Sequence, residues 1–253
     1  DRAASAYNSS FDELVADPGA LVLLSGELLA EAKDLNASRW KSWRPISMAS
    51  EGGAVLNLES DGSIFVTGPN QTGEQYLLTY RLRSPVTGVR IDTVPDPRFP
   101  GGGSGRAPQN GNFHVARFEV AAADAVGDFN VVSISDWMDD GSDAPIGRRA
   151  SKTLDGNRRT MWDTHPNHRS AHWAVFQLDA PVDASAQGGL LRIRVDSGLS
   201  QWGPHGLGRF RISFTETENP IEVEGQYRFL QGMAPTGLNS LACGYALVGD
   251  SQR

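Results

Sequence analysis

One segment of the sequence carries oxygen ligands at a spacing that could bind a metal ion. In SKTLDGNRRTMW, residues 151–162, an Asp-Gly-Asn turn would present the Asp155 carboxylate and several backbone carbonyls in a tight arc, with the Thr160 hydroxyl close behind. Converging hard oxygens suit Ca²⁺, which takes roughly six to eight of them at flexible geometry. An ordinary Asp-Gly turn accounts for the same residues, and spacing alone does not decide between the two.

A second segment, HPNHRSAHW, places His165, His168 and His172 at spacings of three and four residues. Such spacings put imidazoles on one helical face, where they could bind zinc, but Pro166 disrupts that helix and no His-Glu-x-x-His motif accompanies them. The sequence therefore favours His172 facing a strand partner and the other two histidines lining a loop that could hydrogen-bond a polar ligand.

Four tryptophans lie beside polar, glycine-containing segments. Trp137 in SDWMDDGSD and Trp202 in SQWGPHG stand in apparent loops, where an indole flanked by Asp, Arg or His can stack on a sugar ring and hydrogen-bond it. Filling the core is the alternative, and for these two residues both interpretations stay open. For Trp162 and Trp173 the strand-like surroundings favour the core.

No segment shows a nucleophile with its base. The chain lacks a Gly-x-Ser-x-Gly elbow, and the lone cysteine, Cys243, is most simply a small buried hydrophobe that excludes a disulfide framework. Glycosidase carboxylates come from distant strands and leave no local signature, so a hydrolase stays as a third functional hypothesis.

The segment 95–120, PDPRFPGGGSGRAPQNGNFHVARFEV, is rich in glycine and proline. It matches neither the dinucleotide pattern Gly-x-Gly-x-x-Gly nor the Walker pattern, because Gly105 is followed by Arg106-Ala107 and then by a strand. We predict a structural role: three prolines stiffen the exit from one strand, Gly101 to Gly105 allow a reversal, and Gly111-Asn112 begin the next strand.

Composition narrows the class of protein. The 253 residues include 28 Gly and 14 Pro, which predicts many turns and an all-β domain. A net charge of −7 argues against nucleic acid as a partner. No run of about 18 apolar residues occurs, so no transmembrane segment is expected. The chain begins at Asp1 without a leader pattern, which indicates a processed or excised piece. Three sequons, at Asn8, Asn36 and Asn70, could accept glycans in a eukaryotic secretory pathway.

The periodicity predicts three parts. Residues 1–42 form a short helical N-terminal extension, because apolar residues recur at helical spacing over 10–35 with a break at Asp17-Pro18-Gly19. Residues 43–219 contain eight short strands without a long helix between them, which predicts an eight-stranded antiparallel jelly-roll sandwich. Residues 220–253 are a C-terminal appendage that holds a strand or a short helix.

The central segment TLDGNRRTMWDTHPNHRSAHWAVFQLDAP resembles the signature of discoidin-like domains, the coagulation-factor type C and galactose-binding jelly-roll group. EGGAVLNLESDGSIFVTG, VTGVRIDTVPDPRFPGGGSGRAPQNGNFHVARFEV and HGLGRFRISFTE look like a domain of large planctomycete surface or periplasmic proteins that also carry cytochrome c domains. The resemblance covers roughly residues 43–217. It implies a non-catalytic module for glycans or cell surfaces, in an extracellular, periplasmic or cell-surface location.

The resemblance also implies a structural Ca²⁺ ion at the Asp-Gly turn. Its ligands would be the Asp155 side chain, the Asn157 and Lys152 carbonyls and Thr160, with Glu216 or Glu218 closing the site. Arg158 and Arg159 follow the turn directly. Two cations beside the proposed Ca²⁺ ion are a departure from the family's pattern and disfavour an ion there.

Three functional hypotheses follow. The first is polysaccharide binding through loop residues, namely Trp137, Arg148, His168, Arg169 and Trp202. The second is a structural subunit of a larger extracellular or membrane-associated assembly, docked through residues 1–42 and 220–253. The third is a glycan-active hydrolase, which needs two carboxylates about 5 to 9.5 Å apart in a cleft.

Overall fold

The structure is a computed structural model that describes residues 27, 30–31, 34–141, 148–183, 189–199 and 202–231. The chain divides into two compact units, one made of residues 1–39 and 222–253 and the other of residues 40–221. The second unit contains all the described strands.

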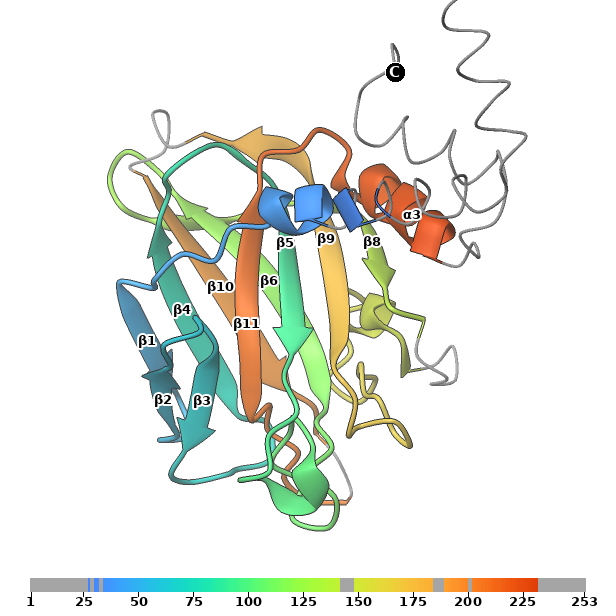
Figure 1. Cartoon of the computed structure of the whole chain (residues 1–253). Coiled ribbons are helices and arrows are strands. Elements are labelled where there is room, and N and C mark those ends of the chain that lie inside the picture. Colours follow the sequence, from blue (N-terminus) through green and yellow to red (C-terminus); the bar gives the residue numbers. More distant parts are fainter. Residues whose placement is uncertain are drawn as a thin grey trace, which may run out of the picture. The chain divides into compact units, whose positions relative to one another are not determined.

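The strands of this unit form two antiparallel sheets that pack face to face as a sandwich (Figure 1). One sheet has the order β1-β4-β10-β6-β7 and the other the order β2-β3-β11-β5-β9-β8. Short 3₁₀ turns lie in two of the loops, η1 at Pro100–Gly102 and η3 at Ala150–Thr153. The strand bounds are β1 Ser47–Ser50, β2 Val55–Leu58, β3 Ile64–Thr67, β4 Gln75–Arg81, β5 Val86–Thr93, β6 Val115–Ala123, β7 Phe129–Val131, β8 Ile134–Asp139, β9 His172–Val182, β10 Leu190–Ser197 and β11 Arg209–Thr215.

The predicted all-β sandwich is confirmed, but the strand count is eleven in the described chain instead of eight. The eight predicted strands correspond to β2 to β6 and β9 to β11. The three that the sequence did not indicate, β1, β7 and β8, lie at sheet edges. β1, SMAS, is as long as β2 and β3 but contains no β-branched or aromatic residue, and β7 has only three residues. β8 has a register shift between Ile134 and Asp136 that breaks its alternation.

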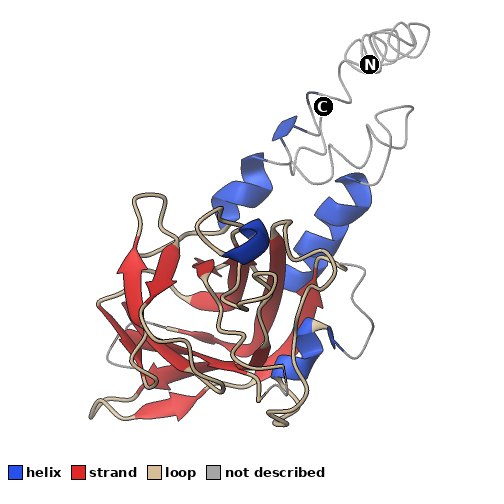
Figure 2. Ribbon diagram, turned by 90° about the horizontal axis from the view of Figure 1, so that it is seen from below, coloured by secondary structure: helices blue, strands red, loops and turns tan. Residues whose placement is uncertain are grey.

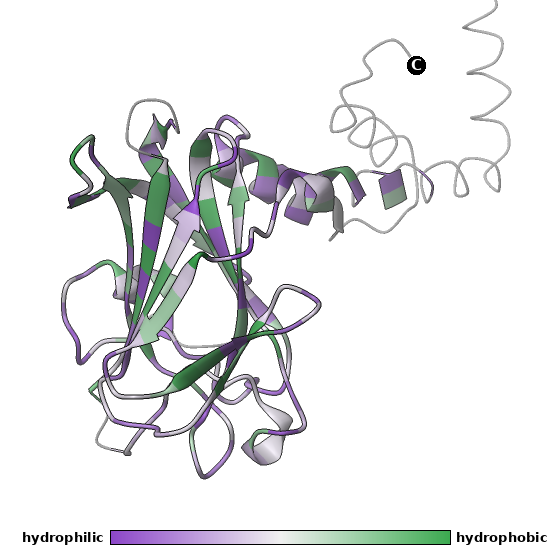
Figure 3. Cartoon of the chain, turned by 90° about the vertical axis from the view of Figure 1, so that its left-hand side faces the viewer, coloured by the Kyte–Doolittle hydropathy of each residue, from purple (hydrophilic) through white to green (hydrophobic). Residues whose placement is uncertain are grey.

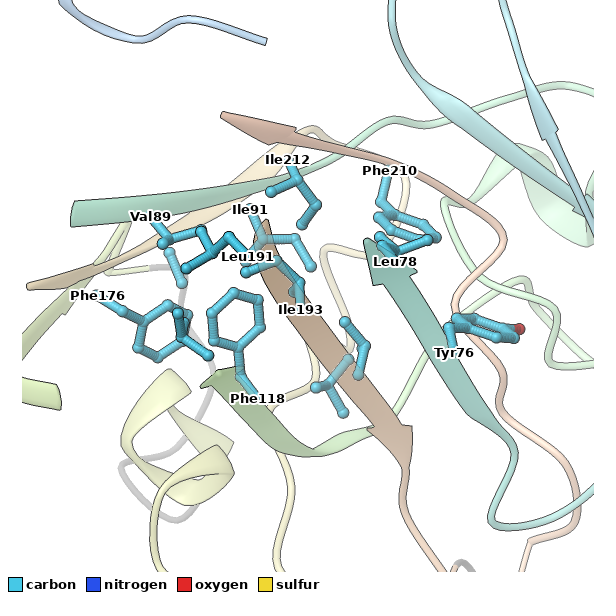
Figure 4. Close-up of a cluster of buried hydrophobic side chains, with 14 of the residues drawn as sticks. Tyr76, Leu78, Val89, Ile91, Phe118, Phe176, Leu191, Ile193, Phe210 and Ile212 are labelled. Atoms are coloured by element: carbon cyan, nitrogen blue, oxygen red, sulfur yellow. The ribbon is translucent and has the colours of Figure 1, made fainter. Parts of the chain in front are cut away.

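Hydrophobic and hydrophilic residues alternate along the strands (Figure 3). The buried apolar side chains of both sheets form one core cluster. Aromatic rings from opposite sheets meet there: Phe118 of β6 stacks on Phe176 of β9 with ring centroids 4.3 Å apart, and Tyr80 of β4 meets Phe214 of β11 edge-on at 4.8 Å. Figure 4 shows part of this cluster. The free energy gained by burying these aromatic side chains, together with the aliphatic ones around them, holds the two sheets together.

A buried phenol near one end of the core retains a hydrogen bond. The Tyr76 hydroxyl donates to the Leu207 carbonyl at 3.0 Å, so its polar tip is satisfied inside the sandwich. Burial raises the pKa of Tyr76 to about 12, which keeps the hydroxyl protonated. This bond ties β4 of one sheet to the segment that precedes β11 of the other.

The antiparallel register brings several loops to the same end of the sandwich. Thr93, the last residue of β5, pairs with both His172 and Phe210, which lie at the beginnings of β9 and β11. In the other sheet, Ser197 at the end of β10 pairs with Val115 at the beginning of β6. The segments 94–114, 162–171, 198–199 and 202–208 therefore meet at one end. Figure 2 shows that end facing the viewer, with the connecting loops in tan.

The other unit is described in part. Residues 34–39 are helical, as are residues 27 and 30–31, and α3 spans Pro220–Gln231. The Asn36 amide donates to Glu224 Oε2 at 3.2 Å, so this sequon is buried and hydrogen-bonded. The rest of the predicted helical extension, Asn8 and Cys243 lie outside the described residues. Among the helices that the structure describes, none has the length and apolar character needed to cross a membrane.

Candidate functional site

An open pocket of about 510 Å³ lies where the loops converge. Its walls come from four segments of the sequence, and the strand register brings three of them, those around residues 109–114, 165 and 202–205, to one end of the sandwich. Its size falls in the range of small-ligand sites, roughly 300 to 1,000 Å³. The lining residues are Gln109, Asn110, Asn112, His114, Arg148, His165, Trp202 and His205.

The glycine-rich segment forms one wall and is closed on itself by backbone hydrogen bonds. The Gly105 N–H donates to the Gly111 carbonyl at 2.8 Å, and the Ala107 N–H donates to the Asn112 carbonyl at 3.1 Å. A Cβ on Gly105 would overlap the backbone of Asn112, and one on Gly103 would overlap that of Gly111. Two backbone segments pass too close for side chains here, so the glycines permit a tight packing that holds the pocket wall in place.

Charged side chains anchor the base of this loop. The Asp96 carboxylate, 2% exposed, binds Arg98 at 2.7 Å and Arg209 at 2.9 Å, and Arg209 also binds Asp61 at 2.9 Å. The hydrogen bonds and positive charge of Arg98, with help from Arg209, lower the pKa of Asp96 to about 2. The loop is therefore fixed to β11 by ionised groups as well as by its backbone bonds.

Two stacked imidazoles form the floor. The His114 and His205 rings lie parallel with centroids 4.0 Å apart, and both residues are buried. The His205 Nδ1–H donates to the Gly203 carbonyl at 3.0 Å, because a carbonyl can only accept. Burial lowers the pKa of His114 from 6.5 to about 3, and the nearby His205 and Arg148 charges act in the same direction. The His114 ring is therefore neutral at physiological pH.

A buried carboxylate lies beneath the pocket. Asp163, 2% exposed, accepts a hydrogen bond from the His165 N–H at 3.0 Å and another from the Asn112 side chain. Arg148 approaches both of its oxygens at 3.4 Å, and His114 Nε2 lies 3.9 Å from Oδ2. Burial raises the pKa of Asp163, while these donors and charges act in the opposite direction. One carboxylate thus holds groups from three walls of the pocket.

Two polar atoms of the floor have no hydrogen-bond partner within the described chain. These are Asn112 Oδ1 and His114 Nδ1, and both residues are 3% exposed. An unsatisfied buried polar atom costs about 1 to 3 kcal/mol, so native proteins keep few of them without a reason. Unpaired polar atoms in residues that line a pocket indicate a place that water or a ligand completes.

The rim carries the groups that a ligand can reach. The Trp202 side chain is 56% exposed and meets the His114 ring edge-on at 6.2 Å. Arg148 is also partly accessible above the Asp163 carboxylate. The structure therefore brings these two sequence-predicted ligand residues together at one pocket, and for Trp202 it decides the open question in favour of the surface.

The other three predicted ligand residues do not line this pocket. His168 is buried beside it and stacks on His165 with centroids 5.6 Å apart, while Arg169 is exposed nearby. Trp137 lies in β8, opposite Phe176 of β9, and packs against the hydrophobic core. The loop expected around Trp137 is a strand at the edge of the sheet, and this side chain belongs to the sandwich instead of the pocket.

The remaining tryptophans divide differently from the prediction. Trp162 is 1% exposed and packs edge-on against Phe113 at 5.1 Å, as expected for the core. Trp173 lies on the outer face of β9, where the Arg90 guanidinium covers its ring at 4.7 Å. The strand alternation places Ala174 inward and its neighbour Trp173 outward, so the core assignment of Trp173 was wrong.

The backbone of His172 pairs with Thr93 of β5, but its imidazole binds loop residues instead of the strand partner that the sequence favoured. His172 begins β9, and its Nδ1 lies 2.5 Å from Asp140 Oδ2 while Nε2 lies 2.8 Å from the Asn167 carbonyl. Burial alone would lower the pKa of His172, but these hydrogen bonds outweigh it and raise the pKa. His172 is thus occupied by its neighbours and does not join His165 and His168 in a zinc site.

His165 lines the pocket, as one of the two histidines that the sequence placed in a loop able to hydrogen-bond a polar ligand. Sequence reasoning missed five of the eight lining residues, namely Gln109, Asn110, Asn112, His114 and His205. Four of them follow the glycine run, for which we predicted a structural role only, and the last stands beside Trp202. A usable signal was present: polar residues follow a glycine-tight turn and precede a strand, at the end where loops gather.

The Asp155 turn is a self-contained hydrogen-bonded unit. The Thr160 hydroxyl approaches both Asp155 oxygens, at 2.7 and 2.9 Å, and the Asn157 carbonyl at 2.8 Å. The Asn157 N–H donates to Asp155 Oδ1 at 2.9 Å, and the Lys152 ammonium lies 3.8 Å from Oδ2. The oxygens proposed as ligands already bind one another and face a cation, so the turn as it stands does not fit a Ca²⁺ ion.

Glu216 is not near this turn. It follows the last residue of β11, Thr215, and its carboxylate binds Lys41 at 3.0 Å. Arg158, by contrast, binds the Gly73 carbonyl near the start of β4, towards the pocket end of the sandwich. In the part of the chain that is described, no three His, Cys, Asp or Glu side chains are arranged to hold a metal. The expectation of a calcium ion at this turn therefore depends on the family resemblance alone.

No known protein-family model matches the chain. No curated protein matches it either. Among solved structures, the CBM32-1 and CBM32-2 domains of Clostridium perfringens ZmpB share 12% identity over 88% of this chain with a TM-score of 0.41. The chain spans about half of that structure, 50%.

Two further structures show weaker likenesses. The CBM32 of AlyQ in complex with 4,5-unsaturated mannuronic acid has 6% identity over 70% of this chain and 99% of its own, with a TM-score of 0.31. CBM32-3 from a family 31 glycoside hydrolase of Clostridium perfringens has 12% identity over 72% and 94%, with a TM-score of 0.32. Such values assign no function, so the proposal below depends on the pocket itself.

Proposed function

We propose that this protein is a non-catalytic module that binds a polysaccharide or cell-surface glycan in the pocket beside Trp202. The observation that supports it most directly is the combination of an exposed indole at the rim with unpaired, buried polar atoms in the floor. A sugar ring has an apolar face that stacks on an indole and hydroxyl edges that exchange hydrogen bonds with amide, imidazole and guanidinium groups.

Each part of the pocket has a role in this proposal. Trp202 supplies the stacking surface, and Arg148 and Gln109 supply hydrogen bonds at the rim. Asn112 and His114 form a polar floor that water or ligand hydroxyls complete. The glycine-tight loop holds these groups before the ligand arrives, which lowers the entropy cost of binding.

The pocket favours binding over hydrolysis. Of the residues that line it in the described chain, none is Asp or Glu, and Asp163 beneath it is 2% exposed and surrounded by donors. Glycoside hydrolysis needs two carboxylates that flank the scissile bond, roughly 5 to 9.5 Å apart. In keeping with a glycan ligand, we also propose an extracellular, periplasmic or cell-surface location. Docking through residues 1–42 and 220–253 stays a prediction.

Affinity electrophoresis and calorimetry on a polysaccharide panel test the proposal. We expect wild-type retention on at least one polysaccharide, and for Trp202→Ala an affinity lower by about tenfold or more with an unchanged unfolding temperature, because the side chain is largely exposed. Trp173→Ala is the matched control, since it removes an indole that does not line the pocket. Absence of binding to every polysaccharide, or equal losses in the two variants, would contradict the proposal.

A further inference from the structure

The charge of the pocket depends on one pair of residues. Arg148 is the lining residue with a permanent charge, and the Asp163 carboxylate lies directly beneath it, with both oxygens 3.4 Å from guanidinium nitrogens. The pair sums to zero charge. At such distances a neighbouring opposite charge cancels most of the field that a ligand would meet.

The other titratable groups at the pocket are imidazoles. His114 is neutral at physiological pH because burial and its cationic neighbours hold its pKa at about 3. His205 stacks on it and His165 lies at the open side.

Beneath the surface, the unpaired atoms add a negative partial charge. Asn112 uses its amide N–H on Asp163, which leaves Oδ1 with its lone pairs unmatched. The nearest His114 nitrogen to the same carboxylate is Nε2, at 3.9 Å, and the carboxylate favours the tautomer with the proton on that atom. The lone pair of His114 then lies on Nδ1, the atom without a partner. Both atoms are acceptors with negative partial charge, so they repel the carboxylate or sulfate of a ligand and do not repel an uncharged sugar.

From these observations we infer that Asp163 is a positioning and specificity-determining residue: it neutralises Arg148, orients Asn112 and His114 as acceptors, and thereby selects uncharged sugars over uronic acids and sulfated sugars. This inference rests on the proposed function and names the ligand class of the same pocket. Asp163 acts through its neighbours, since its own carboxylate is almost completely buried. Excluding an anion in this way is specificity through repulsion.

The test compares matched polysaccharides that differ in charge. Three pairs are used, each with the neutral member first: galactan with polygalacturonate, mannan with polymannuronate, and laminarin with sulfated laminarin. We expect the wild type to bind a neutral member more tightly than its acidic partner. Asp163→Asn removes the compensating charge, so we expect about tenfold weaker binding of the neutral member and about tenfold stronger binding of the acidic one. Its new affinity for the acidic member should fall as salt increases.

Asp124→Asn is the control for net charge, because Asp124 lies in the turn after β6, at the opposite end of that strand from Val115. It should leave both affinities unchanged. If Asp163→Asn does not fold, Arg148→Gln replaces it: an unpaired carboxylate should exclude the acidic member even more strongly. A wild type that prefers the acidic member, a folded Asp163→Asn with the wild-type ratio, or an Arg148→Gln that gains acidic binding would overturn the inference while the proposed function stands.

A ligand-free measurement separates the two proposals if no polysaccharide binds. Quenching of Trp202 fluorescence, taken as the difference between the wild type and Trp202→Phe, reports the local charge when anionic iodide is compared with neutral acrylamide. We expect Asp163→Asn to increase quenching by iodide about twofold and to leave acrylamide quenching unchanged. Equal iodide quenching in the two proteins would overturn the inference even without a glycan.

Discussion

The pocket beside Trp202 and the Asp155 turn are both polar and glycine-containing, but their polar groups differ in burial and in partners. At the Asp155 turn the hydroxyl, carboxylate and backbone groups are mostly exposed and bind one another over a span of five residues. In the pocket floor, Asn112 and His114 are buried and retain unpaired atoms. Where neighbouring residues satisfy one another's hydrogen bonds, the result is a stable turn. Where distant segments bring buried polar groups together and leave some of them unpaired, a ligand can complete the site.

We expect the largest difference between the two regions when the close backbone packing beside the pocket is removed. Gly105→Ala places a methyl group on the Asn112 backbone, which cannot move without opening the loop. We expect a loss of about 3 kcal/mol or more in the free energy of unfolding, together with loss of glycan binding. Denaturant unfolding and calorimetry measure both.

Gly102→Ala is the control for this experiment, because a Cβ there meets nothing within 4 Å. Its positive φ of 69° should cost only about 1 kcal/mol. Gly105 has no positive φ, so its loss should come from the close approach alone, and a loss no larger than that of Gly102→Ala would contradict this account of the loop.

Acid should destabilise the pocket end through His114. The unfolded imidazole binds a proton near pH 6.5, but the folded one resists protonation until about pH 3. The unfolded state therefore binds more protons between these values, and stability present above pH 6.5 is lost as the pH falls, by about 3 kcal/mol at pH 4 and up to about 5 kcal/mol below pH 3. The raised pKa of Asp163 contributes with the opposite sign.

Denaturant unfolding at pH 7 and pH 4 measures this loss, and hydrogen exchange locates it. We expect the amides of residues 105–114 to lose protection before those of residues 150–160. In His114→Gln the difference in the free energy of unfolding between pH 7 and pH 4 should be smaller than in the wild type. An equal difference would show that other groups cause the acid sensitivity.

The smallest effect is expected at the Asp155 turn. Asp155→Ala removes exposed hydrogen bonds, so we expect about 1 kcal/mol of destabilisation and unchanged glycan affinity. Because the turn does not fit a Ca²⁺ ion, adding Ca²⁺ or a chelator to the wild type should leave the unfolding temperature unchanged. A rise of several degrees with Ca²⁺ that Asp155→Ala abolishes would instead establish the predicted calcium site and remove the contrast between the two regions.

Much of the sandwich was predictable because strand alternation is local. Eight strands were read from apolar residues at every second position, and the burial of Trp162 followed from the same pattern. β8 was not predicted because its bulge and its position at the sheet edge break the alternation. Trp137 lies in this strand, so its surroundings were predicted wrongly as a loop. Trp173 was misjudged because nothing in the sequence tells which face of a strand points inward when Arg90 covers the outer one.

By itself, the sequence determined the class of fold, the strand-forming segments and two rim residues of the pocket, Arg148 and Trp202. Only the tertiary structure decided that the glycine-rich segment supplies a pocket wall and that Asp163 lies beneath Arg148. The physical reason is range: alternation and turn chemistry act over a few residues, whereas the pocket forms where strand register brings distant loops together. Burial then determines which polar groups remain unpaired, and burial is a property of the assembled chain.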